Sequence, residues 1–261
     1  MTEVAEKLIL IEKLIDKVLI LNDDPFLKQV KEKCTSCHDA CKNSTQGDAD
    51  DMKNLLKQYA QIVLDYTYSD EGKLVDESFP EDSYRQRIHE IFVWIDTIEE
   101  LVLKCLPQIT MTECLGHEIV ECIHWRKGAL LYMLCCTIKE DDRRVDNLND
   151  EFFMNIKDGV GHLQKMLRVK REITEWNGDQ HAVDLVNMGV YSDTHPLCMM
   201  YAGEMCYWYC QFNRKSMPDF NAKEIGQDLL SKYIKIVKSP LMFGWTSDKA
   251  EEFLTFLSQC P

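Results

Sequence analysis

The densest group of potential metal ligands is a short run near the N-terminus that contains Cys34, Cys37, His38 and Cys41. The order Cys-x-x-Cys-His is the attachment motif of c-type haem, which needs export to an oxidising compartment, whereas the first residues predict no secretory leader. A structural zinc site needs four ligands, and no second Cys-x-x-Cys follows in the sequence. On a helix the three cysteines share one face. We therefore interpret the thiols as small core side chains, with metal binding and redox chemistry as the alternatives.

A second polar group has helical spacing. His117, Glu121 and His124 are four and three residues apart, so a helix places them on one stripe. Glu121-x-x-His124 resembles half of a di-iron carboxylate site, which requires a second Glu-x-x-His and two further inward-facing glutamates. The sequence contains no second Glu-x-x-His. We interpret these residues as the polar stripe of a helix whose other face is buried, with a metal site as the alternative.

Catalytic motifs are absent from the sequence. It contains no glycine-rich phosphate loop, no nucleophile elbow and no His-Glu-x-x-His motif. Gly159-Val-Gly161 lies in a helical pattern and lacks the third glycine of a dinucleotide fingerprint. The spacing of the many cysteines and histidines selects no Cys–His dyad. We expect a protein without catalytic activity or cofactor, and a metal-dependent or Cys–His helical-bundle enzyme is the less favoured alternative.

Acidic residues dominate the charge of the chain. It carries 44 Asp and Glu against 30 Lys and Arg, a formal net charge of −14. No run of Lys and Arg exceeds two residues, so the sequence disfavours nucleic acid and the anionic membrane surface as partners. Most of the twelve cysteines lie within apolar helical patterns. We therefore expect free thiols in a reducing compartment, the cytosol.

The elements that must position these residues are all helical. Apolar residues recur at intervals of three and four, and no stretch alternates as a strand does. The pattern predicts helices over residues 4–18, 25–42, 55–66, 88–102, 110–139, 152–167, 194–212, 225–236 and 246–259. Residues 69–80 read as a connection, and Thr110-x-x-Glu113 predicts a capping box that opens the 110–139 helix. The expected fold is all-α, a single domain of eight or nine helices over residues 1–261.

Two of these helices are expected at the centre of the core. Residues 128–138 and 196–212 are apolar on all sides, which is typical of the centre of a bundle or of a membrane span. The first run is too short to cross a bilayer, and the second carries Glu204 at its middle. We therefore expect both helices inside the bundle and in contact with each other.

Glu204 requires a partner in such a core. A carboxylate on an apolar helix costs several kcal/mol unless it is paired. Arg126 and Lys127 begin the other central helix and are the nearest candidates by hydropathy. We predict a buried Glu204–Arg126 pair that positions the two helices, and a charged feature of a binding groove is the functional alternative.

Three stretches resemble one small protein family: residues Leu74–Ser83, Glu118–Met133 and Met199–Trp208. The family is the Rab-interacting subunit of the Mon–Ccz exchange-factor complex. Weaker similarity extends from about residue 55 to the C-terminus, whereas residues 1–50 look divergent and are expected to pack on residues 51–261. The matching stretches contain no catalytic motif.

The resemblance implies a cytosolic, non-enzymatic adaptor. Such proteins associate with the Mon–Ccz complex and with the late-endosomal Rab GTPase, stabilise that Rab, and help to recruit it to damaged mitochondria during mitophagy. Recruitment to mitochondria or late endosomes would then run through these partners, without direct membrane insertion. The alternative is a generic helical scaffold whose partner is not a Rab.

Five residues are candidates for partner contacts. Leu74, Asp76 and Phe79 lie in the acidic connection, where exposed apolar residues could dock on a partner. The alternative for Phe79 is that it staples the start of the next helix. Trp125 and Trp208 are of a type common among interface anchors, although such residues are more often core.

Overall fold

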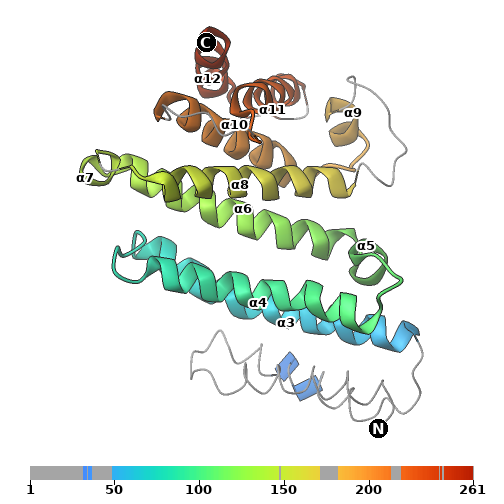
Figure 1. The fold of residues 1–261 in the computed structure, drawn as a ribbon. Coiled ribbons are helices and arrows are strands. Elements are labelled where there is room, and N and C mark those ends of the chain that lie inside the picture. The colour runs from blue at the N-terminus through green and yellow to red at the C-terminus, as the bar shows by residue number, and fades with distance from the viewer. Residues whose placement is uncertain are drawn as a thin grey trace. The chain divides into compact units, whose positions relative to one another are not determined.

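The computed structural model describes residues 32–33, 35–36, 49–146, 148–170, 182–212, 219–240, 242 and 244–260. All regular structure in this part of the chain is helical (Figure 1), so the predicted all-α class is confirmed. The helices are α3 (Ala49–Asp76), α4 (Tyr84–Cys105), α5 (Met111–Leu115), α6 (His117–Glu140), α7 (Asp142–Val145), α8 (Asp150–Val169), α9 (Ala182–Asn187), α10 (Thr194–Phe212), α11 (Ala222–Val237) and α12 (Asp248–Gln259).

The sequence predictions for residues 1–48 fall largely outside the described residues. They are the helices over 4–18 and 25–42, the packing of residues 1–50 on the rest of the chain, and the cysteine run with its ligand candidates Cys34, Cys37, His38 and Cys41. The chain divides into two compact units, residues 1–123 and 124–261, and the division falls within α6. The expectation of a single domain stays a prediction.

The first unit is built on the helical hairpin α3–α4. The predicted apolar stripes form its core: Leu55, Leu56, Tyr59, Ile62 and Val63 on α3, and Ile88, Ile91, Ile95, Ile98 and Val102 on α4 are buried. The hydroxyl groups of Tyr59 and Thr97 lie 2.6 Å apart across the hairpin. Toward the turn between the two helices, Arg87 of α4 pairs with Glu77, directly after the end of α3. The two helices therefore run in opposite directions.

The predicted connection over 69–80 is mostly helix. α3 continues to Asp76 because Leu74 extends its buried face, while the acidic residues of this turn remain solvated. The helix ends where Ser78 and Phe79 adopt left-handed backbone angles, with φ of 54° and 51°. The Phe79 N–H then donates to the Leu74 carbonyl at 2.9 Å, which satisfies one carbonyl of the last turn.

The helix predicted over 110–139 is two helices. The capping box is present as predicted: Thr110 accepts from the Glu113 N–H at 3.2 Å, and the Glu113 carboxylate accepts from the Thr110 N–H at 2.9 Å. However, the box opens only the five-residue α5. Gly116, with φ of +84°, follows and breaks the chain direction before α6 begins. The sequence prediction overlooked this glycine.

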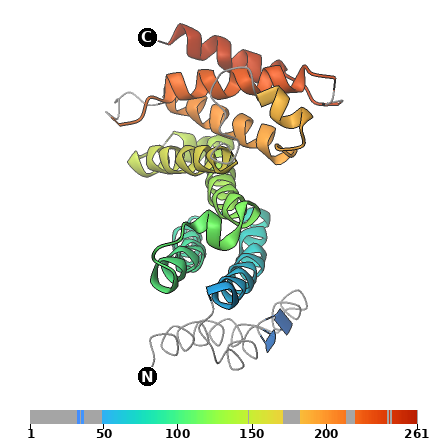
Figure 2. The same cartoon turned by 90° about the vertical axis from the view of Figure 1, so that its right-hand side faces the viewer.

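The second unit is arranged around α10. This helix packs against α8, α11 and α12, and Figure 2 shows it between the α8 layer and the two last helices. The ring of Tyr132 on α6 stacks on Tyr201 of α10 at 3.8 Å between ring centres. The predicted contact between the two apolar helices is therefore confirmed, and α10 is central as expected.

Glycines allow α10 and α11 to approach closely. A Cβ at Gly203 would lie 2.5 Å from Leu230 of α11, and one at Gly226 would lie 2.8 Å from the Cβ of Cys206. Real Cβ atoms do not come so close to a neighbour, so a side chain at either glycine would force the opposite residue to move. Within the residues that the structure describes, no helix has both the length and the apolar character that crossing a membrane requires.

Candidate functional site

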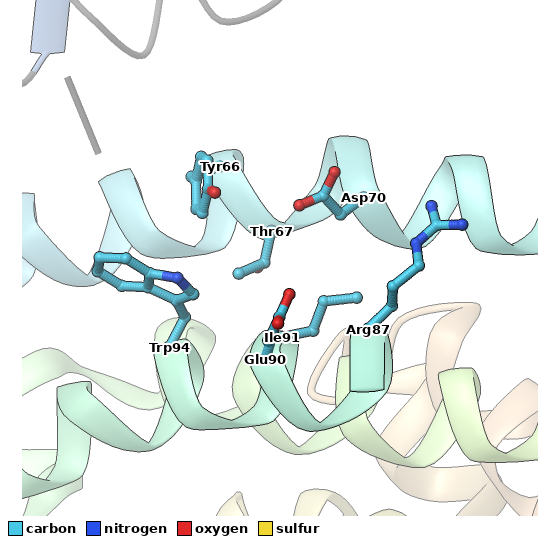
Figure 3. A pocket seen from close by; sticks show the side chains of 7 residues that line it. All are labelled: Tyr66, Thr67, Asp70, Arg87, Glu90, Ile91 and Trp94. Carbon is cyan, nitrogen blue, oxygen red and sulfur yellow. The ribbon is translucent and has the colours of Figure 1, made fainter. Parts of the chain in front are cut away.

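An open cavity of about 330 Å³ lies between α3 and α4, and we name it the α3–α4 groove (Figure 3). Its lining residues come from facing positions of the hairpin: Tyr66, Thr67 and Asp70 on α3, and Arg87, Glu90, Ile91 and Trp94 on α4. The ring of Tyr66 meets the ring of Trp94 edge to face, with 5.5 Å between ring centres and 71° between planes. Figure 3 shows these rings at one end of the groove and Arg87 at the other.

The floor of the α3–α4 groove is largely apolar. Thr67 and Ile91 are buried there. The Thr67 hydroxyl donates to the Val63 carbonyl at 2.9 Å within α3, so its hydrogen is directed into the helix. A ligand in the groove would therefore meet hydrocarbon below and polar groups at the walls.

The walls of the groove carry two carboxylates. Figure 3 shows Asp70 and Glu90 between the aromatic end and Arg87. Burial, and then the negative charges of Asp70 and Glu90, raise the pKa of Tyr66 above its usual value. The Arg87 guanidinium is held by Glu77, outside the pair of wall carboxylates. The field within the groove is therefore negative.

The buried Glu204 forms the polar centre of the second unit. Its side chain is 3% exposed, and the carboxylate accepts a hydrogen bond from the Tyr132 hydroxyl at 2.9 Å and pairs with the Lys249 ammonium at 2.6 Å. The prediction of Arg126 as its ion-pair partner is wrong. The partner comes from α12, the last helix of the chain, which packs on α10. Arg126 is itself buried, at 8% exposure.

Lys249 and Lys238 form a matched pair for testing this centre. Both side chains are 60% exposed, but the carboxylate that Lys249 pairs with is 3% exposed, whereas the partner of Lys238, Glu251, is 46% exposed. Lys249→Met is expected to lower the free energy of unfolding by about 1–2 kcal/mol, because it leaves a buried charge with fewer partners. Lys238→Met should cause at most a small loss, since both members of its pair are largely exposed and water screens their attraction. If chemical denaturation showed the same loss of unfolding free energy for Lys249→Met and Lys238→Met, the central role of Glu204 would be contradicted.

Four aromatic rings stack in a column between α6 and α10. Trp125 lies on Tyr201 with 5.6 Å between ring centres, Tyr201 on Tyr132 at 3.8 Å, and Tyr132 on Trp208 at 5.5 Å, all within 19° of parallel. Trp208 is 1% exposed, so it is a core residue and not an exposed contact. Trp125, at the other end of the column, is half-buried.

The structure gives mixed outcomes for the other contact candidates. Leu74 and Phe79 are fully buried, so the expectation that they are exposed apolar contacts is wrong. Their burial follows from the extension of α3 and from the turn that folds Phe79 inward. Asp76 is exposed, and its role in partner binding stays a prediction.

His124, on the polar stripe of α6, lies beside His162 of α8. The Nδ1 atoms of His124 and His162 lie 3.4 Å apart. Burial, together with the charges of Lys165 and Lys127, lowers the pKa of His124 to about 4. Over the part of the chain that the structure describes, no three His, Cys, Asp or Glu residues are arranged to hold a metal ion. The metal alternative for His117, Glu121 and His124 therefore finds no support.

The lowered pKa of His124 predicts acid sensitivity. Between pH 6.5 and 4 the unfolded chain binds a proton at this residue that the folded chain does not, so stability falls as the pH falls. The loss should reach about 2–3 kcal/mol near pH 4. His124→Gln should flatten this part of the pH profile, whereas His89→Gln, at an exposed position of α4, should leave it unchanged. Denaturant titrations at pH 7.5, 6, 5 and 4 would measure it, and identical profiles for all three proteins would contradict the assignment.

The described cysteines are free thiols: Cys105, Cys114, Cys122, Cys135, Cys136, Cys198, Cys206, Cys210 and Cys260. Burial raises the pKa of Cys114, Cys136 and Cys210 to about 11 in each case. A thiol with such a pKa is protonated at neutral pH and is a weak nucleophile. These three positions therefore lack the activated thiolate that a Cys–His enzyme uses.

Sequence reasoning missed the residues of the α3–α4 groove. A signal was present, because Tyr66 and Asp70 are four residues apart, as are Glu90 and Trp94. Each pair places an aromatic ring and a carboxylate on one helix face. Only the antiparallel pairing of α3 and α4 brings the two faces together.

The family model and the curated relatives that match this chain carry the same family name. The family model described as RAB7A-interacting MON1-CCZ1 complex subunit 1 matches residues 28–222. A Danio rerio protein of that name is 35% identical over 223 residues, which is 81% of each chain. The Homo sapiens protein of that name is 31% identical, covering 90% of this chain and 87% of the relative, and the Mus musculus protein is 32% identical, covering 91% and 88%. No solved structure matches significantly. With this similarity over most of its length, the chain belongs to the family of RAB7A-interacting MON1-CCZ1 complex subunit 1.

Proposed function

We propose that this chain is a non-enzymatic adaptor that binds the late-endosomal GTPase RAB7A and its exchange factor, the MON1–CCZ1 complex. The observation that carries the proposal is the similarity of 31–35% identity to relatives named for those partners, over most of both chains. As such an adaptor, the chain stabilises the Rab and supports its recruitment to damaged mitochondria in mitophagy. It reaches mitochondria or late endosomes through these partners.

Features of the described residues support a binding role. The α3–α4 groove is open to solvent and combines aromatic and charged side chains, which are the residue types that anchor protein interfaces. The buried Glu204 of the second unit, by contrast, is engaged by Tyr132 and Lys249. Such a centre stabilises a helical scaffold that presents its surface to partners.

Direct binding tests the proposed function. The purified chain would be mixed with RAB7A loaded with GDP or with a GTP analogue, and separately with the MON1–CCZ1 complex. Co-elution and calorimetry should detect a complex with at least one of them, while a Rab from another compartment serves as the negative control. Absence of binding to RAB7A in both nucleotide states and to MON1–CCZ1 would refute the proposal and favour a scaffold with a different partner.

The adaptor role is separable from catalysis of nucleotide exchange. Release of a fluorescent GDP analogue from RAB7A should be unchanged by the chain alone. With MON1–CCZ1 present, the chain should remain bound while the exchange factor performs the release. Nucleotide release by the chain alone would mean that it is itself an exchange factor, and the adaptor assignment would be wrong.

A further inference from the structure

The dimensions of the α3–α4 groove suit one long side chain. Its volume of about 330 Å³ lies at the lower end of the range of about 300–1,000 Å³ that is typical of small-molecule sites. The groove is open along the hairpin, so a segment of another protein could lie across it and insert a single residue. Figure 3 shows the seven lining side chains along the facing sides of α3 and α4, with Trp94 and Arg87 at opposite ends.

The two carboxylates of the groove favour a positively charged ligand. Asp70 on α3 and Glu90 on α4 face the same space from opposite helices, and both act on the Tyr66 hydroxyl. Nearby polar groups neutralise them only in part: Lys73 lies 3.8 Å from Asp70, and Gln86, an uncharged amide, donates to Glu90 at 2.7 Å. Acidic residues outnumber basic ones by more than two to one over residues 49–123, so the surrounding field has the same sign.

The aromatic end of the groove narrows the choice among cations. Trp94 presents the ring type that attracts cations most strongly, and its half-buried indole is held by the edge contact with Tyr66. A guanidinium group is planar, so it can stack on the indole and bond a carboxylate with two N–H groups at once. An ammonium group is also attracted to the ring, but it is a compact charge without this planar fork. The apolar floor at Thr67 and Ile91 suits the methylene stem of the same side chain.

We propose that the α3–α4 groove is a binding site for an arginine side chain of a basic segment in a partner protein, with the guanidinium between Trp94 and the carboxylates of Asp70 and Glu90. Arg87 of the chain does not fill this place, because Glu77 holds it at the other end of the groove. The identity of the partner, RAB7A or the MON1–CCZ1 complex, rests on the proposed function. The recognition of arginine rests only on the residues of the groove.

A peptide titration tests the groove without any named partner. The full chain, labelled with nitrogen-15, would be titrated with a peptide of alternating glycine and arginine, and with counterparts that carry lysine or uncharged citrulline. The indole N–H resonance of Trp94 is assigned by its loss in Trp94→Phe. The arginine peptide should shift it, the lysine peptide should bind at least about threefold more weakly, and the citrulline peptide should have no effect. An unshifted resonance, or equal affinity for arginine and lysine, would overturn the proposal.

Matched variants test the groove in the complex. Asp70→Asn combined with Glu90→Gln removes both wall carboxylates while keeping side-chain size. Asp96→Asn combined with Glu100→Gln removes the same charge from exposed positions of α4 outside the groove. The groove variant should lose about tenfold in affinity for the partner, as expected for the loss of two charge contacts at the protein surface, and the control less than about twofold. Circular dichroism checks that both variants fold.

The outcomes separate the two proposals. If the unaltered chain binds RAB7A or MON1–CCZ1 and the groove variant binds equally well, the groove assignment is wrong and the adaptor function stands. If the unaltered chain binds neither partner, the adaptor function fails, and the peptide titration still decides whether the groove recognises arginine.

Discussion

Trp208→Ala is expected to lower the free energy of unfolding by about 3–5 kcal/mol, the range for removing a large aromatic side chain from a core. Trp208 is 1% exposed on the central helix α10, and its ring stacks on Tyr132 at 5.5 Å. Its removal leaves a cavity between α6 and α10 that these packed helices cannot fill. Chemical denaturation followed by circular dichroism would measure the loss.

Trp125→Ala is the matched control for this substitution. Trp125 lies at the other end of the same aromatic column, is half-buried, and stacks on Tyr201. Its replacement should cost about 1–2 kcal/mol, because part of the ring is already in water. A loss for Trp208→Ala no larger than that for Trp125→Ala would show that Trp208 does not belong to the core.

Phe79→Ala should destabilise the first unit by a similar amount, about 3–5 kcal/mol. Phe79 is fully buried although it lies in the turn between α3 and α4, at a left-handed backbone position. Its side chain therefore anchors the turn, and the backbone bond to the Leu74 carbonyl depends on that anchor. Thermal and chemical unfolding would both report the loss.

Asp76→Ala, three residues earlier, provides the control. Asp76 is the last residue of α3 and is exposed, so its replacement should change stability by no more than about 0.5 kcal/mol. If Phe79→Ala were equally mild while partner binding was lost, Phe79 would be an exposed contact after all, and the buried turn would be wrong.

Much of the helical framework follows from the sequence. The apolar stripes predicted over 55–66, 88–102 and 152–167 each lie within a helix, because burial of a 3.6-residue face is the main determinant of helix position. The capping box at Thr110 and Glu113 is a local arrangement and was also predicted. Local patterns of this kind need no knowledge of tertiary contacts.

The wrong predictions concern helix ends and an ion-pair partner, which tertiary contacts and backbone geometry determine. Acidic residues at 69–77 suggested a connection, but a solvated helix face tolerates them while Leu74 holds the other face in the core. Gly116 breaks a pattern that is otherwise continuous. Lys249 is 45 residues from Glu204, so hydropathy within the two central helices could not identify it as the partner.

The candidate site could be predicted only in part. The spacing of Tyr66 with Asp70, and of Glu90 with Trp94, is visible in the sequence, but the sequence does not state that the two faces meet. Leu74 and Phe79 are apolar residues in an acidic stretch, a composition that suits an exposed loop. The extension of α3 and the turn that follows it place both side chains in the core.

Hydrogen–deuterium exchange of the full chain, alone and with MON1–CCZ1 and RAB7A bound to a GTP analogue, is the most direct test that this chain is an adaptor and that it binds through its first unit. Exchange is expected to slow on complex formation in the segments that line the groove, residues 63–70 of α3 and 87–94 of α4. Unchanged exchange throughout the chain would contradict the adaptor function, and slowing confined to residues 124–261 would contradict binding through the α3–α4 groove.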